Sequence, residues 1–520
     1  METKSNQKVT AAARYGTLEA TRTTVLNRGR YNSRLTIPGL VPEDGQDENS
    51  GFAQPYQSLG ARAVNNLAAW LLVSLFPPDQ HFFRFKVDED TASELGAESL
   101  SEVTSALSRL AGKVQDYLES SAARPTLMEA LLHLIVAGNV LLYIPKDTEG
   151  RRKPPRMWRM DQYVVLRNER GDMIEAVIRE KVHVSSLSEE TIAACKVNYK
   201  AEDKNTTKVD LHTHVKREGD QMVWYQEINK NLVPGSEGKA PADSSGWLPL
   251  RWKAIPGSDW GRAHVSEYIA DLMTLDDLNK AIIQFAAAAS RVIHMVDPAS
   301  MVDVEELEQA ESGDYVTGYI DKVNTMQLDK AMDFQVAAEV ASRVELRLSH
   351  AFMLQSGTVR NAERVTAEEI RAMAEELENV LGGVYTVLSA EFQLPLVRRL
   401  IYILEKTDDS FPELPDEIIP TIVTGFEAIG RTHSANKLRA WMGDMVGIYG
   451  PGVIQEITDP VEIGRRFGES YGIEDLGSLM KTQEQLQQER EQAAQQQAVQ
   501  SAAPQIAAGA VDAATSPEME

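Results

Sequence analysis

Two stretches decide the fold: HVSEYIADLMTLDDLNKAIIQFAAAASRV at residues 264–292 and KAMDFQVAAEVASRVELRLSHAFML at residues 330–354. In both, apolar residues recur at steps of three and four, which is the period of an amphipathic helix. At about 1.5 Å rise per residue, each helix would be roughly 40 Å long. The two apolar stripes consist of Leu275, Leu278, Ile282, Phe285, Ala289 and Val292, and of Phe334, Ala337, Ala341, Val344, Leu348 and Ala351.

A compact, acidic insert separates the two predicted helices. It should contain a strand near residues 291–296, a short acidic helix, the turn GDYVTG at 313–318 and a strand that ends in MQLD at 326–329. From Asp297 to Asp321 there are eight acidic residues and no basic one. Such a charge run is either a solvated surface or a docking face for a basic partner.

A third helix should begin in VTAEEIR at 365–371, where Thr366 and Glu369 form a capping box. Gly382 and Gly383 are a candidate kink, and Pro395 a stop or bend. The connection QSGTVRNAE at 355–363 is polar and contains a glycine, so it predicts a flexible loop before the capped start.

The first 260 residues mix helical and strand patterns. A helix is expected over 101–118, and hairpins are expected about Gly171 with Asp172 and about Gly219 with Asp220. The most apolar stretch, residues 130–144, is shorter than the ~18 residues of a membrane span and predicts a buried core element. The fold class is therefore α+β, mainly helical, with an antiparallel sheet.

Composition limits the classes of function. The net charge of −24 leaves no overall basic stripe of the kind that grips DNA. An acidic surface either keeps a protein soluble or lets DNA pass without sticking. The single cysteine, Cys195, excludes internal disulfides, and the first residues lack the apolar region of a secretory signal. We expect the protein to stay in the compartment where it is made.

Motifs for enzymatic chemistry are missing or weak. No phosphate-binding loop of the G-x-x-x-x-G-K-[ST] type occurs. His212 and His214 lie on one strand face, as a metal pair would, but Asp210 and Lys216 share that face, as on a half-exposed strand with a polar outer side. Two basic clusters could contact nucleic acid or be solvated surface. They are Arg151, Arg152, Lys153, Arg156 and Arg159, and Arg14, Arg22, Arg28, Arg30 and Arg34.

Eight short blocks, in this order, carry a resemblance to a known family. They are TIPGL at 36–40, LGARAVNNLA at 59–68, AGNVLLYIP at 137–145, GDYVTG at 313–318, VTAEEIR at 365–371, LGGVY at 381–385, FQLPLVR at 392–398 and TGFEAIGR at 424–431. Through them the chain resembles the portal, or head-to-tail connector, proteins of short-tailed, autographivirus-type bacteriophages (podophages), from about Thr36 to Gly430.

The resemblance implies a dodecameric ring around an axial channel, with wing, stem, clip and crown regions. Residues 1–263 would be wing, 264–293 and 330–354 the two stem helices, 294–329 an α/β clip and 355–365 a tunnel loop. Residues 366–429 would be the long wing helix and a return to the wing, 430–480 a helical crown, and 481–520 a Gln- and Ala-rich tail that is a helical barrel or disordered.

The resemblance also implies the function. The ring would sit in the virion at the unique portal vertex between capsid and tail, after assembly in the host cytoplasm. It would nucleate the head and pass double-stranded DNA during packaging and ejection, without sequence specificity. Its partners would be further copies of itself, the terminase large subunit, the tail adaptor, the major capsid and scaffolding proteins and internal core proteins, with no membrane, cofactor or enzymatic activity. The alternative is a metal-dependent hydrolase built around His212 and His214.

Three sets of residues are the candidate functional positions. The tunnel loop is expected to bring Arg360, Asn361 and Arg364 to the channel, although Arg364 could instead pair with Glu368. The stem should present Asp271, Asp276 and Asp277 to the channel or to neighbouring subunits. The clip should dock its partner through Glu305, Glu306, Glu308, Glu311 and Asp314.

Overall fold

The computed structural model describes residues 10–46, 50–77, 81–147, 152–289, 293–297, 304–310, 315, 323–326, 331–354, 381, 383–415, 417–422, 438–448, 463–464 and 467–468. These residues belong to two compact units. Unit 1 is drawn from residues 1–78 and 117–407, and unit 2 from residues 79–116 and 408–520. The described chain mixes α-helices with antiparallel sheets, as the sequence predicts.

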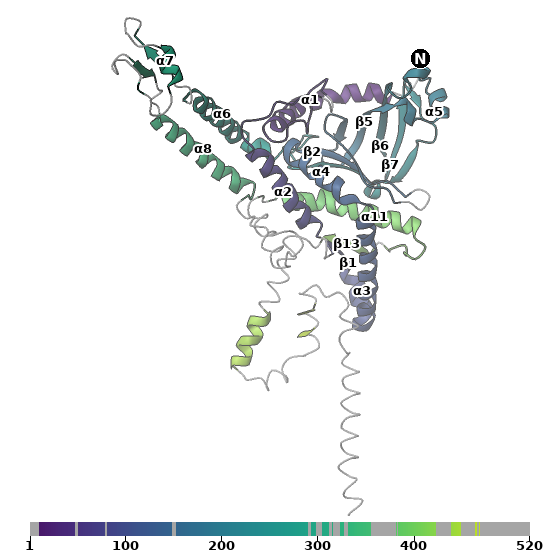
Figure 1. The fold of residues 1–520 in the computed structure, drawn as a ribbon. Coiled ribbons are helices and arrows are strands. Elements are labelled where there is room, and N and C mark those ends of the chain that lie inside the picture. Colours follow the sequence, from purple (N-terminus) through teal and green to yellow (C-terminus); the bar gives the residue numbers. More distant parts are fainter. Residues whose placement is uncertain are drawn as a thin grey trace, which may run out of the picture. The chain divides into compact units, whose positions relative to one another are not determined.

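Two antiparallel sheets form the centre of unit 1 (Figure 1). The larger has the order β4-β5-β6-β7-β8, with β9 also paired to β7. Its strands are β4 (Tyr163–Arg167), β5 (Met173–His183), β6 (Lys208–Glu218), β7 (Gln221–Ile228), β8 (Asn231–Leu232) and β9 (Gly238–Pro241). The smaller has the order β10-β2-β3, formed by β10 (Trp247–Arg251), β2 (Asn139–Tyr143) and β3 (Arg156–Trp158). Both predicted hairpins are confirmed, and Gly171 and Gly219 adopt positive φ in their turns.

The larger sheet is buried on both faces. On one side its residues join those of the smaller sheet in a core rich in tryptophan, which includes Trp158, Trp247 and Trp260. On the other side lies α1 (Ala11–Leu35), whose Tyr15 and Leu18 pack against the sheet. A small separate core under α5 (Glu189–Ala194) contains Cys195. Short 3-10 turns occupy Val184–Ser186, Ala201–Asp203 and Ala242–Ser244.

The apolar run over residues 130–144 is buried as expected, but it is two elements rather than one. Helix α4 (Ala123–Ala137) ends at Gly138, and β2 begins at the next residue. Gly138 has a φ of 78°, and a Cβ added there would lie 2.6 Å from the backbone nitrogen of Ala263. Only glycine combines that left-handed conformation with so close an approach of two backbones.

The two long helices predicted by the opening stretches are confirmed. They are α6 (Val265–Ala289) and α8 (Ala331–Ala351), which run side by side in unit 1 (Figure 1). Between them in sequence come β11 (Ile293–Val296), α7 (Val304–Gln309) and β12 (Val323–Met326), and β11 pairs antiparallel with β12. We call α6, α8 and these three elements the arm. Its helices contact the rest of unit 1 through α1, α4 and α2 (Leu59–Leu75).

After the arm, the described chain resumes in three helical elements. Gly383 precedes α10 (Val384–Leu388), which is followed by a π-helix at Ser389–Gln393 and then by α11 (Leu394–Thr407). Pro395 does not stop the helical run as expected, since it lies in the first turn of α11, directly after the π-helix. The capped start at Thr366 and Glu369 lies outside the described residues.

Unit 2 contains a two-stranded antiparallel sheet of β1 (Phe83–Val87) and β13 (Ile418–Ile422). Helix α3 (Glu89–Ser120), which includes the helix expected over 101–118, begins in unit 2 and ends in unit 1. A further helical segment covers 438–448. Within the described parts of both units, no helix is long and apolar enough to cross a membrane.

Candidate functional site

The arm is fixed to unit 1 at the start of α6 and the end of α8. His264 precedes α6 and is 4% exposed, and its Nε2 donates to the carbonyl oxygen of Ala351 at 3.1 Å. Burial lowers the pKa of His264. The side-chain amide of Asn66 on α2 donates to the carbonyls of Phe352 and Met353, the two residues after α8. Both ends of the arm are therefore tied to the same body.

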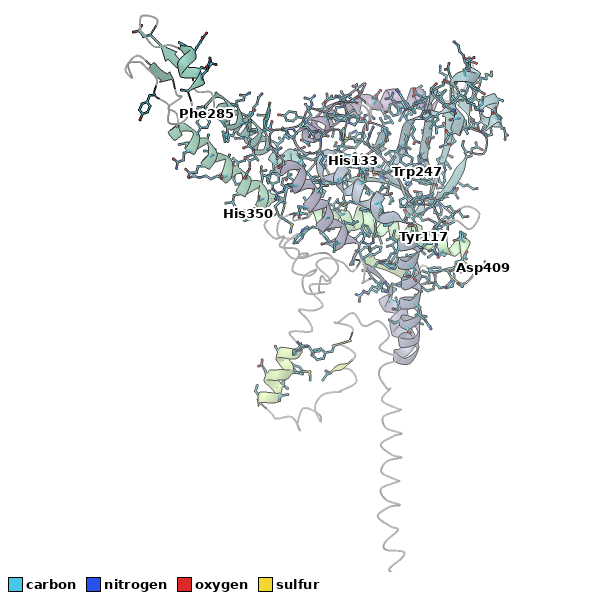
Figure 2. All side chains as sticks on the ribbon, in the orientation of Figure 1. Tyr117, His133, Trp247, Phe285, His350 and Asp409 are labelled. Carbon is cyan, nitrogen blue, oxygen red and sulfur yellow. The ribbon has the colours of Figure 1, made fainter. Side chains whose placement is uncertain are left out.

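Packing between the two arm helices changes along their length. Near the root, Leu272 and Leu275 of α6 and Val344 and Leu348 of α8 are buried. Farther out, the described residues of α6 are only half-buried or exposed, and the rings of Phe285 and Phe334 stack on each other (Phe285 is labelled in Figure 2). The helices α6 and α8 of a single copy thus leave large apolar side chains in water. These are Met273 and Leu346 near the root, and Ile283, Val336 and Val340 farther out.

The three stem carboxylates have different surroundings. Asp271 pairs with Arg347 of α8, with 2.8 Å between Oδ1 and Nη2. Asp276 accepts a hydrogen bond from the backbone N–H of Tyr56, whose ring also lies under the ammonium group of Lys280. Asp277 is exposed. Two of the three predicted stem acids therefore already contact groups of their own chain.

The clip and tunnel-loop candidates are described only in part. Glu305, Glu306 and Glu308 lie on α7, and the side chains of Glu305 and Glu308 are exposed. Glu311 and Asp314 lie outside the described residues, as do Arg360, Asn361 and Arg364 of the tunnel loop.

The two histidines of β6 lie beneath α1 and contact other side chains of the chain. The two ring nitrogens of His214 lie 2.7 Å from Glu175 Oε1 and 2.8 Å from the Tyr225 hydroxyl. Arg14 of α1 donates hydrogen bonds to both carboxylate oxygens of Glu175. Burial raises the pKa of Glu175, but the hydrogen bonds from His214 and Arg14 outweigh it and lower the pKa to about 2.

His212 packs edge-on against Tyr15, and burial lowers its pKa. The expected half-exposed polar face is therefore wrong where α1 crosses it, since His214 is only 8% exposed. Among the residues that the structure describes, no group of three or more His, Cys, Asp or Glu side chains could hold a metal ion.

Most arginines of the two basic clusters contact acidic or aromatic side chains of the same chain. Arg14, Arg22, Arg30 and Arg34 form ion pairs with Glu175, Glu19, Asp44 and Glu43, respectively. Arg156 pairs with Glu180, Arg159 with Asp161, and Arg152 lies over the ring of Tyr117. These contacts give most of the clustered arginines a structural role within unit 1.

Sequence reasoning missed two exposed arginines of α8, Arg343 and Arg347. Their spacing of four residues places them on one side of the helix, next to the apolar stripe. That spacing is the signal in the sequence that could have found them.

Comparison with known proteins identifies the family. The model of the family "Bacteriophage head to tail connecting protein" matches residues 8–476. The chain is similar to a portal protein of Escherichia phage T7, at 37% identity over 91% of this chain and 89% of the relative. It is also similar to a portal protein of Enterobacteria phage T3, at 38% identity over 92% and 89%.

A solved structure of the virion of a native gene transfer agent particle aligns over 86% of this chain and 93% of its own, at 10% identity and a TM-score of 0.40. Because the family match spans residues 8–476 and both phage relatives align over about nine-tenths of the chain, the chain belongs to the bacteriophage head to tail connecting protein family.

Proposed function

We propose that the chain is the portal subunit of a short-tailed bacteriophage, and that it forms the channel for double-stranded DNA at one vertex of the capsid. One observation carries the proposal: relatives named portal protein align over about nine-tenths of both chains at 37% and 38% identity. The arm agrees with it, since the outer arm of a single copy exposes apolar side chains that neighbouring copies in a ring would cover.

In this proposal twelve copies form the ring. Residues 1–263 and 366–429 are mainly wing, α6 and α8 the stem, the elements between them the clip, and residues 430–480 the crown. The ring nucleates the head, docks the terminase large subunit during packaging and then holds the tail adaptor. It also contacts the major capsid, scaffolding and internal core proteins, assembles in the host cytoplasm, and works as a conduit without enzymatic activity or cofactor.

The proposed residue roles follow the same division. Arg360, Asn361 and Arg364 form the narrowest ring of the channel, and the α7 acids with Glu311 and Asp314 dock the partner. Among the stem acids, Asp277 is the one that the structure leaves exposed, so it is the best candidate to face a neighbouring copy or the channel. The hydrolase alternative has less support, because both ring nitrogens of His214 are occupied by Glu175 and Tyr225.

The test is the mass of the purified full chain in solution, with negative-stain images of the same sample and its zinc content. We expect closed rings of about twelve copies with a central channel and no stoichiometric zinc. A monomer or dimer that binds one zinc per chain would overturn the portal proposal and support the hydrolase.

A further inference from the structure

A row of basic side chains runs along one exposed side of α8. Arg343, Arg347 and His350 are spaced by four and three residues, which places them on one side of the helix. The side chains of Arg343 and Arg347 are 74% and 64% exposed, and His350 is exposed too (labelled in Figure 2). The buried residues Val344 and Leu348 lie on the neighbouring side, and the exposed Val336 and Val340 share the side of the row farther out along α8.

Each arginine of the row has a carboxylate of its own chain. Arg343 Nη2 lies 2.5 Å from Glu339 Oε1, one turn earlier on α8. Arg347 Nη2 lies 2.8 Å from Asp271 Oδ1, which comes from α6. Exposed pairs of this kind contribute about 0–1 kcal/mol to folding. The two pairs therefore add little to stability. Their main effect is on surface charge, because each carboxylate balances the positive charge of its guanidinium.

We propose that this row is a charge-compensated contact surface for the phosphates of double-stranded DNA, in which Glu339 and Asp271 compete with phosphate for the two arginines. A guanidinium binds a carboxylate and a phosphate through the same fork of N–H groups. A passing phosphate can therefore replace a carboxylate without a net gain of ion pairs. The inference rests on the proposed function, which brings DNA to the arm.

The compensation matters because the row would be repeated in every copy. The two arginines are about 6 Å apart along the helix at 1.5 Å per residue. Each phosphate that an unpaired cation neutralises releases counterions and adds to affinity. A ring of uncompensated arginines would hold the duplex, while compensated ones give brief contacts and little grip. Glu339 and Asp271 thus act as positioning residues that tune DNA affinity through Arg343 and Arg347.

The experiment measures binding of a fluorescent duplex of about 30 base pairs to the full-length protein as salt is raised from about 50 to about 200 mM. The isosteric variant Asp271→Asn with Glu339→Gln should bind about tenfold more tightly at low salt. Its plot of log affinity against log salt should steepen by roughly 0.9 for each released arginine that engages a phosphate. Adding Arg343→Gln and Arg347→Gln to this variant should return both quantities to those of the wild type.

Glu189→Gln is the matched control. It removes the carboxylate of another ion pair, Lys204–Glu189, which lies outside the arm on α5, and should leave DNA affinity unchanged. A purely structural role for the pairs would alter thermal stability but not the salt slope. Affinity in the double variant that matches the control, or that survives loss of both arginines, would overturn the inference. Protein that forms no rings would instead overturn the proposed function.

Discussion

Glu175 shows how a functional motif in the sequence can be a structural contact. It lies on β5, opposite the strand that carries His214, and is 7% exposed. Arg14 reaches it from α1, His214 from β6, and Tyr225 of β7 closes the chain of hydrogen bonds. The buried carboxylate thus joins α1 to three strands, which explains a His-x-His pair without metal chemistry.

The first prediction concerns the pH dependence of this contact. The pKa of Glu175 is about 2 in the fold, below its ordinary value of 4.5. A lowered pKa means that the carboxylate stabilises the fold above about pH 4.5, and that this contribution is lost as the pH falls toward 2. Glu175→Gln should therefore lower the free energy of unfolding by on the order of 2 kcal/mol at pH 7, and by much less at pH 3.

Urea unfolding followed by tryptophan fluorescence at several pH values measures the difference between the two proteins. Glu237→Gln, at an exposed loop position, is the control and should match the wild type throughout. A gap between wild type and Glu175→Gln that stays constant from pH 7 to pH 3 would contradict the assignment of the low pKa.

At the scale of elements, the period of the apolar residues predicts α6 and α8, and the turn residues predict the hairpins at Gly171 and Gly219. These signals are local, so a single sequence is enough to find them. The sequence does not show which element packs against each face of a helix or sheet. The polar side of β6 was expected to be solvated, but α1 packs over it. Because α1 lies about 200 residues earlier in the chain, no local pattern in the sequence indicates this contact. The helix-to-strand junction at Gly138 was hidden because the residues on both sides of it are almost all apolar, so their period does not separate a helix from a strand.

The second prediction tests that junction. Gly138→Ala should lower the free energy of unfolding by about 3 kcal/mol or more, because strain of the left-handed backbone adds to overpacking. The added Cβ meets backbone atoms of Arg262 and Ala263, which cannot rotate away as a side chain can. Gly219→Ala is the matched control, since Gly219 also has positive φ but nothing within 4 Å of the added Cβ.

For Gly219→Ala, only backbone strain of about 1–2 kcal/mol is expected. Denaturant titration of both variants measures the two losses. Equal losses for Gly138→Ala and Gly219→Ala would show that the close approach at residue 138 has no energetic effect.

The third prediction concerns α7. If the clip docks its partner by charge, the triple change Glu305→Lys, Glu306→Lys and Glu308→Lys should leave assembly intact and abolish attachment of the tail adaptor, because opposite charges steer the partner there. Co-sedimentation of assembled particles with the adaptor measures this, and wild-type binding should weaken with salt.

The control changes Glu218, Asp220 and Glu237 to Lys, three exposed acids outside the arm with the same total charge change. This variant should bind the adaptor normally. If the α7 variant does so as well, α7 is a solvated acidic helix and the docking assignment fails.

At the scale of the whole molecule, the proposed conduit must let DNA move in both directions and yet hold it between the two events. The fourth prediction assigns the holding to Arg360 and Arg364, repeated by symmetry. Changing both to Ala should leave particle assembly normal and let packaged DNA leak, because brief phosphate contacts at one narrow ring are lost. DNA content of purified particles over time measures the leak, and full retention would reject the assignment.

The pairing of β1 with β13 has a consequence for synthesis. About 330 residues separate the two strands of this small sheet in the chain. At roughly 5–20 residues per second, a ribosome takes on the order of tens of seconds to deliver β13 after β1 has emerged. During that interval Phe83 and Phe85, buried in the finished protein, have no strand to cover them, and their exposed edge can pair with other nascent chains. Unit 2 therefore completes late in translation, and pairing between nascent chains on one polysome would lower its yield.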